Sequence, residues 1–280
     1  MKYIEIKAPA KINIGLSVIS KRPDGYHNLS TLFYPINDLF DLMTFELSES
    51  FSFSCSNSNL PQDEGNLVVK AKNLLENITG KKLSVKINLQ KFIPSQAGLG
   101  GGSSDAAATL ISLNELFLLG LNNEKLNTLA LELGSDVPFF IRALPAVGSS
   151  RGEILDMIDL EIENPILIVN PGINISTHDA FHNIKPKNSI LNYSHIIRDG
   201  RLDFDFMRNN IGNDFEEYAF REYPEIAAIK NQLYNEGAVF SLMSGSGSSV
   251  YGIFENIELA EKTKNNFPKN YFCYLSTPHH

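Results

Sequence analysis

The most informative stretch of the sequence is glycine-rich, residues 94–104, which reads PSQAGLGGGSS. Glycine lets the backbone turn its N–H groups toward one point, and a large anion can approach them closely because no Cβ atoms intervene. A helix is predicted from about Ser104, and its N-terminus would add unpaired donors. Ser103 and Ser104 could cap this helix or reach a phosphate or its metal ion. Four glycines within five residues are entropically costly for a mere linker, so the stretch predicts an anion cradle.

Two common nucleotide-binding motifs are excluded here. The stretch is not a P-loop, because no Gly-Lys-Ser/Thr follows at the required spacing. It is not the dinucleotide fingerprint either, since the third glycine and the later acidic residue are missing. A phosphate must therefore be bound in another way.

Strands and helices are predicted on both sides of the loop. Alternating apolar residues indicate strands over residues 4–18 and 29–36, and a strand over residues 83–89 that leads into the loop. Asn66 is expected to cap a helix. Beyond residue 160 the order is strand, helices, strand, strand, helix, strand, which is the split βαβ plan.

Composition limits the class of protein. The chain has 280 residues, of which 43% are hydrophobic, so one or two domains are expected. Its 32 acidic and 24 basic residues include no basic run, which argues against binding to nucleic acid or an anionic membrane. Lys7 and Lys11 interrupt the N-terminal segment, and no apolar run approaches a membrane span. Because Cys55 and Cys273 lie in no metal or redox spacing, we expect a soluble cytoplasmic protein without disulfides.

Two charged residues are candidates for catalysis. By alternation, Lys11 shares one strand face with Asn13, although a lone lysine on a strand is more often solvated surface. Asp136 lies in the sequence GSDVPFF, where a helix cap or a turn carboxylate is the simpler explanation. On pattern alone, both interpretations of each residue stay open.

Four motifs in this order resemble the GHMP kinases, a superfamily that includes galactokinase and the homoserine and mevalonate kinases. They are PAKIN at residues 9–13, the serine-ended glycine stretch, GSDVPFF at 134–140 and SGSGS at 244–248. Their order and spacing match over essentially the whole chain. One departure is Ser150 in SRGE, where the family commonly has the first glycine of Gly-x-Gly-Glu, so the local backbone there is open.

The resemblance implies an α+β fold in two domains. Residues 1–158 would carry the nucleotide loop on a fold like domain 2 of ribosomal protein S5, and residues 159–280 would form a ferredoxin-like split βαβ domain. The active site would lie in the cleft between them. The implied activity is transfer of a phosphoryl group from ATP, with Mg²⁺, to the hydroxyl of a small molecule.

Residue roles also follow from the resemblance. Asp136 would be the general base, and Lys11 beside it would keep the carboxylate ionised and stabilise charge near the phosphoryl group. The loop would wrap the ATP phosphates, and two other residues would lie near the adenine. Together these are Pro94, Ser95, Gln96, Ala97, Gly98, Leu99, Gly100, Gly101, Gly102, Ser103, Ser104, Asn66 and Lys91.

Shorter motifs resemble one branch of the family, whose alcohol carries cytidine diphosphate. They are DGYH at residues 24–27, NLV at 66–68 and NPG at 170–172. The resemblance implies that Tyr26, His27 and Asn13 bind the cytidine diphosphate part, with Asp136 at the reacting hydroxyl. The simpler interpretation of Tyr26 is a hairpin aromatic that packs on its neighbour.

Two alternative functions remain. One is a kinase for homoserine or mevalonate, against which the Tyr26-His27 pair argues. The other is a non-catalytic nucleotide-binding regulator, which should have lost Asp136 or Lys11, yet both are present.

Overall fold

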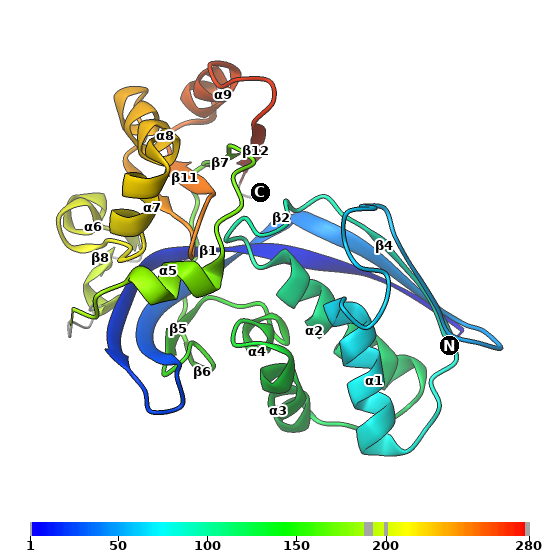
Figure 1. The fold of residues 1–280 in the computed structure, drawn as a ribbon. Coiled ribbons are helices and arrows are strands. Elements are labelled where there is room, and N and C mark those ends of the chain that lie inside the picture. The colour runs from blue at the N-terminus through cyan, green and yellow to red at the C-terminus, as the bar shows by residue number, and fades with distance from the viewer. Residues whose placement is uncertain (1, 188–192, 199–200, 278–280) are drawn as a thin grey trace. The chain divides into compact units, whose positions relative to one another are not determined.

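The structure is a computed structural model that describes residues 2–187, 193–198 and 201–277 (Figure 1). The chain divides into two compact units. Unit 1 contains residues 1–10, 35–95 and 100–144, and unit 2 contains residues 11–34, 96–99 and 145–280. The long strands β1 (Tyr3–Lys21) and β2 (His27–Leu47) contribute residues to both units. A contiguous division into residues 1–158 and 159–280 stays a prediction.

Unit 1 combines strands with a group of four helices. The strand β4 (Val85–Gln90) pairs antiparallel with β2 and parallel with β3 (Ser52–Cys55). The helices are α1 (Leu67–Thr79), α2 (Gly101–Leu116), α3 (Asn123–Leu133) and α4 (Val137–Phe140). They pack on one another, and Figure 1 shows them together on one side of the strands. Because β4 ends just before residue 94, the glycine stretch connects this strand to α2.

The helix boundaries test the capping predictions. Asn66 is the N-cap of α1, and its side chain accepts a hydrogen bond from Val68 N, so that prediction is confirmed. The helix α2 begins at Gly101, earlier than predicted, with Gly100 as N-cap and no side-chain cap. The prediction that Ser103 or Ser104 caps this helix is therefore wrong, because both residues lie inside its first turn.

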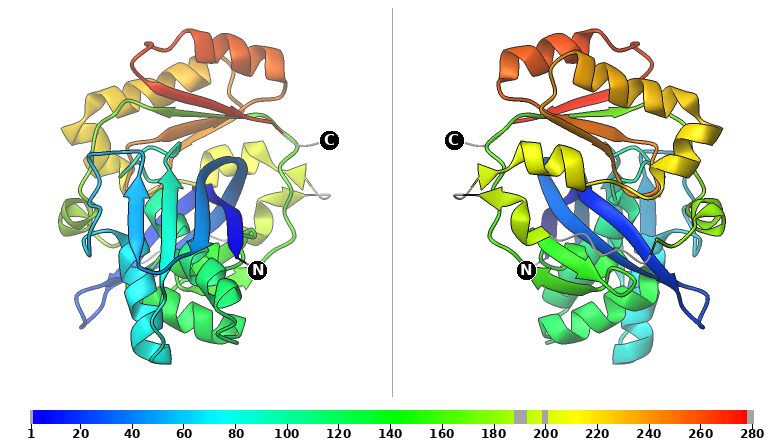
Figure 2. Two further views of the ribbon diagram at one scale, coloured as in Figure 1. Left: turned by 90° about the vertical axis from the view of Figure 1, so that its right-hand side faces the viewer. Right: turned by 90° about the vertical axis from the view of Figure 1, so that its left-hand side faces the viewer.

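Unit 2 contains a four-stranded antiparallel sheet in the order β10-β11-β7-β12. Its strands are β7 (Ile166–Asn170), β10 (Phe240–Met243), β11 (Val250–Ile253) and β12 (Phe272–Ser276). The helix α8 (Pro224–Asn235) packs on β10 and β11, and α9 (Ile257–Asn265) packs on β12 and β7 (Figure 2). Since β11 separates β7 from β10, the predicted split βαβ plan is confirmed.

The remaining elements of unit 2 are short. They are β5 (Ala146–Ser149), β6 (Ile154–Met157), α5 (Thr177–Asn183), a 3-10 helix (Tyr193–His195), β8 (Ile197–Arg198), β9 (Arg201–Leu202), α6 (Phe204–Asn210) and α7 (Glu216–Glu222). The strand β5 pairs antiparallel with β2 and with β6. Leu16 and Val18 of β1 are buried in the same apolar cluster as Val169 and Phe215. An N-terminal segment is thus part of the core formed by the C-terminal half. None of the helices in the described part of the chain has the length and apolar character needed to cross a lipid bilayer.

Candidate active site

Lys11 lies in a buried polar cluster of unit 2. Its side chain belongs to a residue that is only 2% exposed, so the interpretation as a solvated surface lysine is wrong. Lys11 Nζ donates to Asn13 Oδ1 at 2.6 Å and to the carbonyl oxygen of Gly98 at 3.0 Å. Ser244 Oγ donates to the same carbonyl oxygen at 2.8 Å. The cluster therefore joins the PAKIN motif, the glycine stretch and the SGSGS motif.

Close approach of two glycine segments makes this cluster feasible. Gly98 has a φ of +76°, and a Cβ placed on it would lie 2.0 Å from the carbonyl oxygen of Ser244. A Cβ on Gly245 would lie 3.3 Å from Lys11 Nζ. Ser249 N also donates to Ala97 O at 3.2 Å. Only glycine permits this backbone geometry at position 98.

Asn13 is held from several directions. It is 1% exposed, and its Nδ2 donates to Thr31 Oγ1 at 2.8 Å. Its backbone N–H donates to Ser244 Oγ at 3.2 Å, and Tyr251 donates its hydroxyl to Asn13 O at 3.1 Å. The sequence pattern did not indicate Thr31 or Tyr251 as partners of Asn13.

The first turn of α2, in unit 1, continues the glycine stretch. Gly102 is exposed, and a Cβ on it would lie 3.8 Å from Leu67. Ser104 is 1% exposed, and its hydroxyl has no hydrogen-bond partner among the described residues. With no side-chain cap on α2, this turn retains the donors and dipole that bind anions.

Asp136 lies at the N-cap position of α4 and is half-buried. Its side chain makes no capping hydrogen bond to the described backbone of α4. The interpretation of this carboxylate as a helix cap is therefore wrong. Asp136 belongs to unit 1 and Lys11 to unit 2, so their predicted pairing stays a prediction.

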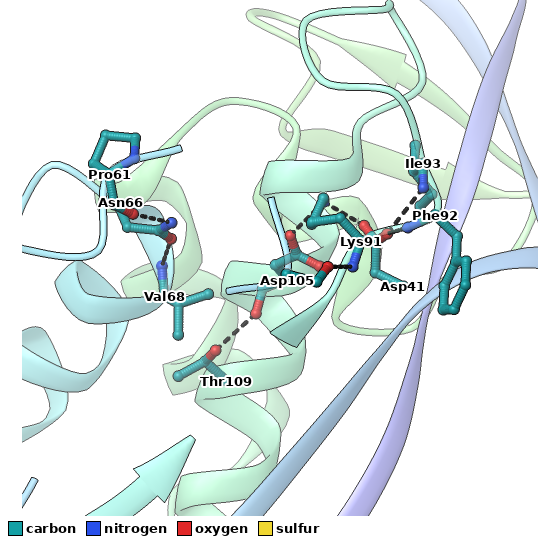
Figure 3. Close-up of polar contacts among 10 residues, drawn as sticks. Asp41, Pro61, Asn66, Val68, Lys91, Phe92, Ile93, Asp105 and Thr109 are labelled. Carbon is teal, nitrogen blue, oxygen red and sulfur yellow. Dashed lines mark hydrogen bonds and ion pairs between the residues drawn. The ribbon is translucent and has the colours of Figure 1, made fainter. Parts of the chain in front are cut away.

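Lys91 lies between two buried carboxylates in unit 1 (Figure 3). Its Nζ is 2.7 Å from Asp105 Oδ2 and also contacts Asp41, and the Lys91 side chain is 6% exposed. Asp41 Oδ1 in turn accepts hydrogen bonds from the backbone N–H groups of Phe92 at 2.6 Å and Ile93 at 2.9 Å. The sequence pattern did not indicate either aspartate. We call Asp41, Lys91 and Asp105 the Lys91 triad.

Burial and charge oppose each other in the Lys91 triad. Burial alone would lower the pKa of the Lys91 ammonium, but the carboxylates of Asp105 and Asp41 outweigh it and raise that pKa. Burial raises the pKa of Asp105 to about 7, against the attraction of Lys91 and with the support of the Asp41 charge. One ammonium cannot neutralise two carboxylates, so Asp105 is present in both its protonated and its ionised form near pH 7.

Both polar atoms of the Asn66 side chain bond nearby backbone groups. Its Oδ1 accepts from Val68 N at 3.0 Å, and its Nδ2 donates to Pro61 O at 2.8 Å (Figure 3). Gly102 lies close to Leu67, which places the start of α1 beside the glycine stretch. The predicted positions of Asn66 and Lys91 near an adenine stay predictions.

Tyr26 and His27 follow the turn between β1 and β2, in unit 2. Tyr26 is 49% exposed, and the guanidinium of Arg151 lies 3.6 Å from its ring centroid. His27 stacks on Phe181, with ring centroids 5.1 Å apart and planes inclined by 18°. Burial, and then the nearby charge of Lys21, lower the pKa of His27, which favours the neutral form of its ring. The sequence pattern did not indicate Phe181 or Arg151.

Metal ions in proteins are typically held by clusters of His, Cys, Asp and Glu side chains. In residues 2–187, 193–198 and 201–277, no group of three or more His, Cys, Asp or Glu side chains could hold a metal ion. The Ser104 hydroxyl, which has no hydrogen-bond partner among the described residues, is one oxygen at the loop that could contact a metal ion.

Comparison with known proteins identifies the family. The model described as GHMP kinases N terminal domain matches residues 66–143, and the model described as GHMP kinases C terminal matches residues 200–272. The chain is 40% identical over 276 residues to 4-diphosphocytidyl-2-C-methyl-D-erythritol kinase of Chloroherpeton thalassium, covering 95% of this chain and 94% of that protein. It is 43% identical over 272 residues to the protein of the same name from Bacteroides thetaiotaomicron, covering 95% and 96%.

Solved structures agree with this result. A crystal structure of 4-(cytidine 5'-diphospho)-2C-methyl-D-erythritol kinase matches with a TM-score of 0.81 and 31% identity, covering 99% of this chain and 100% of that one. Homoserine kinase from Cytophaga hutchinsonii matches with a TM-score of 0.75 and 21% identity, covering 99% and 95%, and supports the fold alone. The chain belongs to the GHMP kinase family. The two relatives described above, and the first of these structures, carry the name of one and the same kinase.

Proposed function

We propose that this chain transfers the γ-phosphoryl group of ATP to the 2-hydroxyl of 4-diphosphocytidyl-2-C-methyl-D-erythritol, a step of non-mevalonate isoprenoid biosynthesis. The observation that carries the proposal is the 40% identity, over 95% of the chain, to a relative of that name. The full motif set, including Lys11, Tyr26, His27 and Asp136, supports it. A cytoplasmic location remains part of the proposal.

Asp136 acts as the general base in this mechanism. It takes the proton of the 2-hydroxyl as that oxygen bonds to the γ-phosphorus, while the bond from phosphorus to the β–γ bridging oxygen breaks and ADP leaves. Support comes from the place of Asp136 in the GSDVPFF motif, which lies within residues 66–143 that match the N-terminal model of the family.

Lys11 stabilises negative charge on the transferring phosphoryl group. Its burial supports this role, because the electrostatic attraction between an ammonium and a phosphate is stronger where water is excluded. Asn13 Oδ1 and the Gly98 carbonyl oxygen orient the ammonium, so its direction is set before substrate binds. Catalysis of phosphoryl transfer consists mostly of such positioning.

The glycine stretch, residues 94–104, holds the ATP phosphates. Positive φ values at Gly98 and Gly100, and the uncapped start of α2, support this assignment. Mg²⁺ bound with ATP would neutralise phosphate charge, and Ser104 fits as a ligand because its buried hydroxyl lacks a partner among the described residues. Asn66 and Lys91 lie toward the adenine end.

Tyr26, His27 and Asn13 bind the cytidine diphosphate part of the substrate. An exposed tyrosine ring can stack on a pyrimidine, which supports the role of Tyr26. A neutral histidine both donates and accepts a hydrogen bond, so His27 can read the polar edge of cytosine. Asn13 contributes through the side chain that also orients Lys11.

A coupled assay of ADP release tests the proposed function. The purified chain is given ATP and Mg²⁺ with each of three alcohols: the cytidine-bearing erythritol, homoserine and mevalonate. Turnover of the cytidine compound alone is expected. Turnover of homoserine or mevalonate without the cytidine compound would overturn the substrate assignment, and no turnover of any alcohol with retained ATP binding would favour a regulator.

A further inference from the structure

The turn between β5 and β6 carries a stacking partner for Tyr26. Arg151 lies on this turn, and its guanidinium carbon is 3.6 Å from the Tyr26 ring centroid. At that distance the planar cation covers one ring face in direct contact. Tyr26 is nevertheless 49% exposed, so much of the side chain remains open to solvent. Without Arg151, a tyrosine on an exposed turn would sample several rotamers.

Hydrogen bonds fix the turn that carries Arg151. Arg151 N donates to Glu153 Oε2 at 2.7 Å, and Ser150 Oγ donates to Glu153 Oε1 at 3.0 Å. Ser150 has a φ of +60°, the left-handed conformation that favours glycine. This is the position at which the sequence departs from the family's glycine. The side-chain bond to Glu153 keeps serine in a conformation that would otherwise be strained.

The β5–β6 turn is also bonded to the turn that carries Tyr26. Arg22 Nη1 donates to Ser150 Oγ at 2.8 Å, and Leu29 N donates to Ser150 O at 2.7 Å. Arg22 forms an ion pair with Asp24 at 3.0 Å, and Asp24 Oδ1 accepts from Tyr26 N at 3.1 Å. Hydrogen bonds therefore hold the Tyr26 backbone and the turn that carries Arg151, whose guanidinium lies against the Tyr26 ring.

We propose that Arg151 is a positioning residue for substrate recognition, which fixes the Tyr26 ring so that its other face can stack on the cytosine base. This inference rests on the proposed function, because it needs a cytidine-bearing substrate. Fixing the ring before binding removes the entropy that would otherwise be lost on binding. Arg151 thus affects substrate affinity through Tyr26 and not through the phosphoryl transfer step.

Two measurements test the proposal. Calorimetry gives the Kd of cytidine and of CDP, and steady-state kinetics gives kcat and KM for the cytidine-bearing erythritol and ATP. Arg151→Ala is expected to raise both Kd values and the KM of the alcohol by about two- to ten-fold. The kcat and the KM for ATP should stay within about two-fold. Arg151→Lys should give an intermediate loss, because it keeps the charge and loses the planar stack.

A double-mutant cycle separates positioning from direct contact. In a Tyr26→Ala background, adding Arg151→Ala should cause no further loss, because the ring through which it acts is gone. An equal loss in that background, or a loss for CDP but not for cytidine, would overturn the proposal in favour of a direct phosphate contact. An unchanged Kd for Arg151→Ala would also overturn it. A wild-type chain that binds neither cytidine nor CDP would instead refute the proposed substrate.

Discussion

The ammonium of Lys91 lies 2.7 Å from Asp105 Oδ2 and also contacts Asp41, so it is shared by two carboxylates. Asp105 lies in the second turn of α2. Asp41 accepts hydrogen bonds from the backbone N–H groups of Phe92 and Ile93, just before the glycine stretch. The Lys91 triad therefore ties both ends of this stretch to unit 1. Removing one partner of a buried ion pair leaves an uncompensated charge, so the loss of any member of the Lys91 triad should destabilise the glycine stretch that the triad anchors.

Lys91→Met should lower the free energy of unfolding by about 3–5 kcal/mol, since it leaves two buried carboxylates without a cation. Urea unfolding at pH 7.5 measures the change. Lys70→Met is the matched control, because Lys70 is exposed on α1, and its effect should stay within about 0.5 kcal/mol. Equal, small effects of both substitutions would show that the triad contributes little.

Asp105→Asn should change how stability depends on pH. The pKa of Asp105 is raised to about 7 in the folded chain, so its protonated form is the one that folding favours. Its contribution to stability is complete below the unfolded pKa, about 4, and is lost as pH rises through about 7. Asparagine resembles the protonated acid, so the variant should gain stability relative to wild type as pH rises from about 4 to about 7, and the difference should level off above that range. A difference that does not vary with pH, in urea unfolding at each pH, would contradict the raised pKa.

Asp136→Asn should reduce kcat by roughly 10²–10⁴ and leave the Kd of a non-hydrolysable ATP analogue nearly unchanged. The amide keeps the shape of the side chain but cannot accept the proton. Asp156→Asn, on the exposed strand β6, is the control and should keep normal kcat. If Asp136→Asn also keeps near-normal kcat, Asp136 is not the base.

Gly98→Ala should lower the stability of the fold, whereas Gly102→Val should weaken ATP binding and leave the fold intact. A Cβ on Gly98 would lie 2.0 Å from the Ser244 carbonyl oxygen, so that variant should lose at least about 2 kcal/mol of stability. The nearest atom to a Cβ on Gly102 is 3.8 Å away, so that variant should fold normally. Its side chain should keep phosphates from the loop and raise the KM for ATP about tenfold or more. Thermal unfolding and ATP kinetics distinguish the two, and unchanged ATP kinetics in Gly102→Val would remove Gly102 from the site.

Local patterns predicted the local structure well. Alternation identified β1, β4 and the first part of β2, but it did not indicate β3, β5 or β6. The Asn66 cap and the split βαβ order also followed from residues close together in the chain. Contacts between distant segments had no such signal. Lys11 and Gly98 are 87 residues apart, and Asn13 and Ser244 are 231 apart, so neither the burial of Lys11 nor its partners could be inferred from spacing. Asp41 was missed for the same reason, because its partner Lys91 lies 50 residues away.

The bonds of Asn13 to Ser244 and Tyr251 also constrain how the chain matures during synthesis. A ribosome that adds about 5–20 residues per second needs roughly 12–48 s to proceed from residue 13 to residue 251. Throughout that interval the second half of β1 has been made but lacks these partners. A nascent chain released before residue 244 cannot assemble the lysine cluster, even if every residue of unit 1 has already emerged.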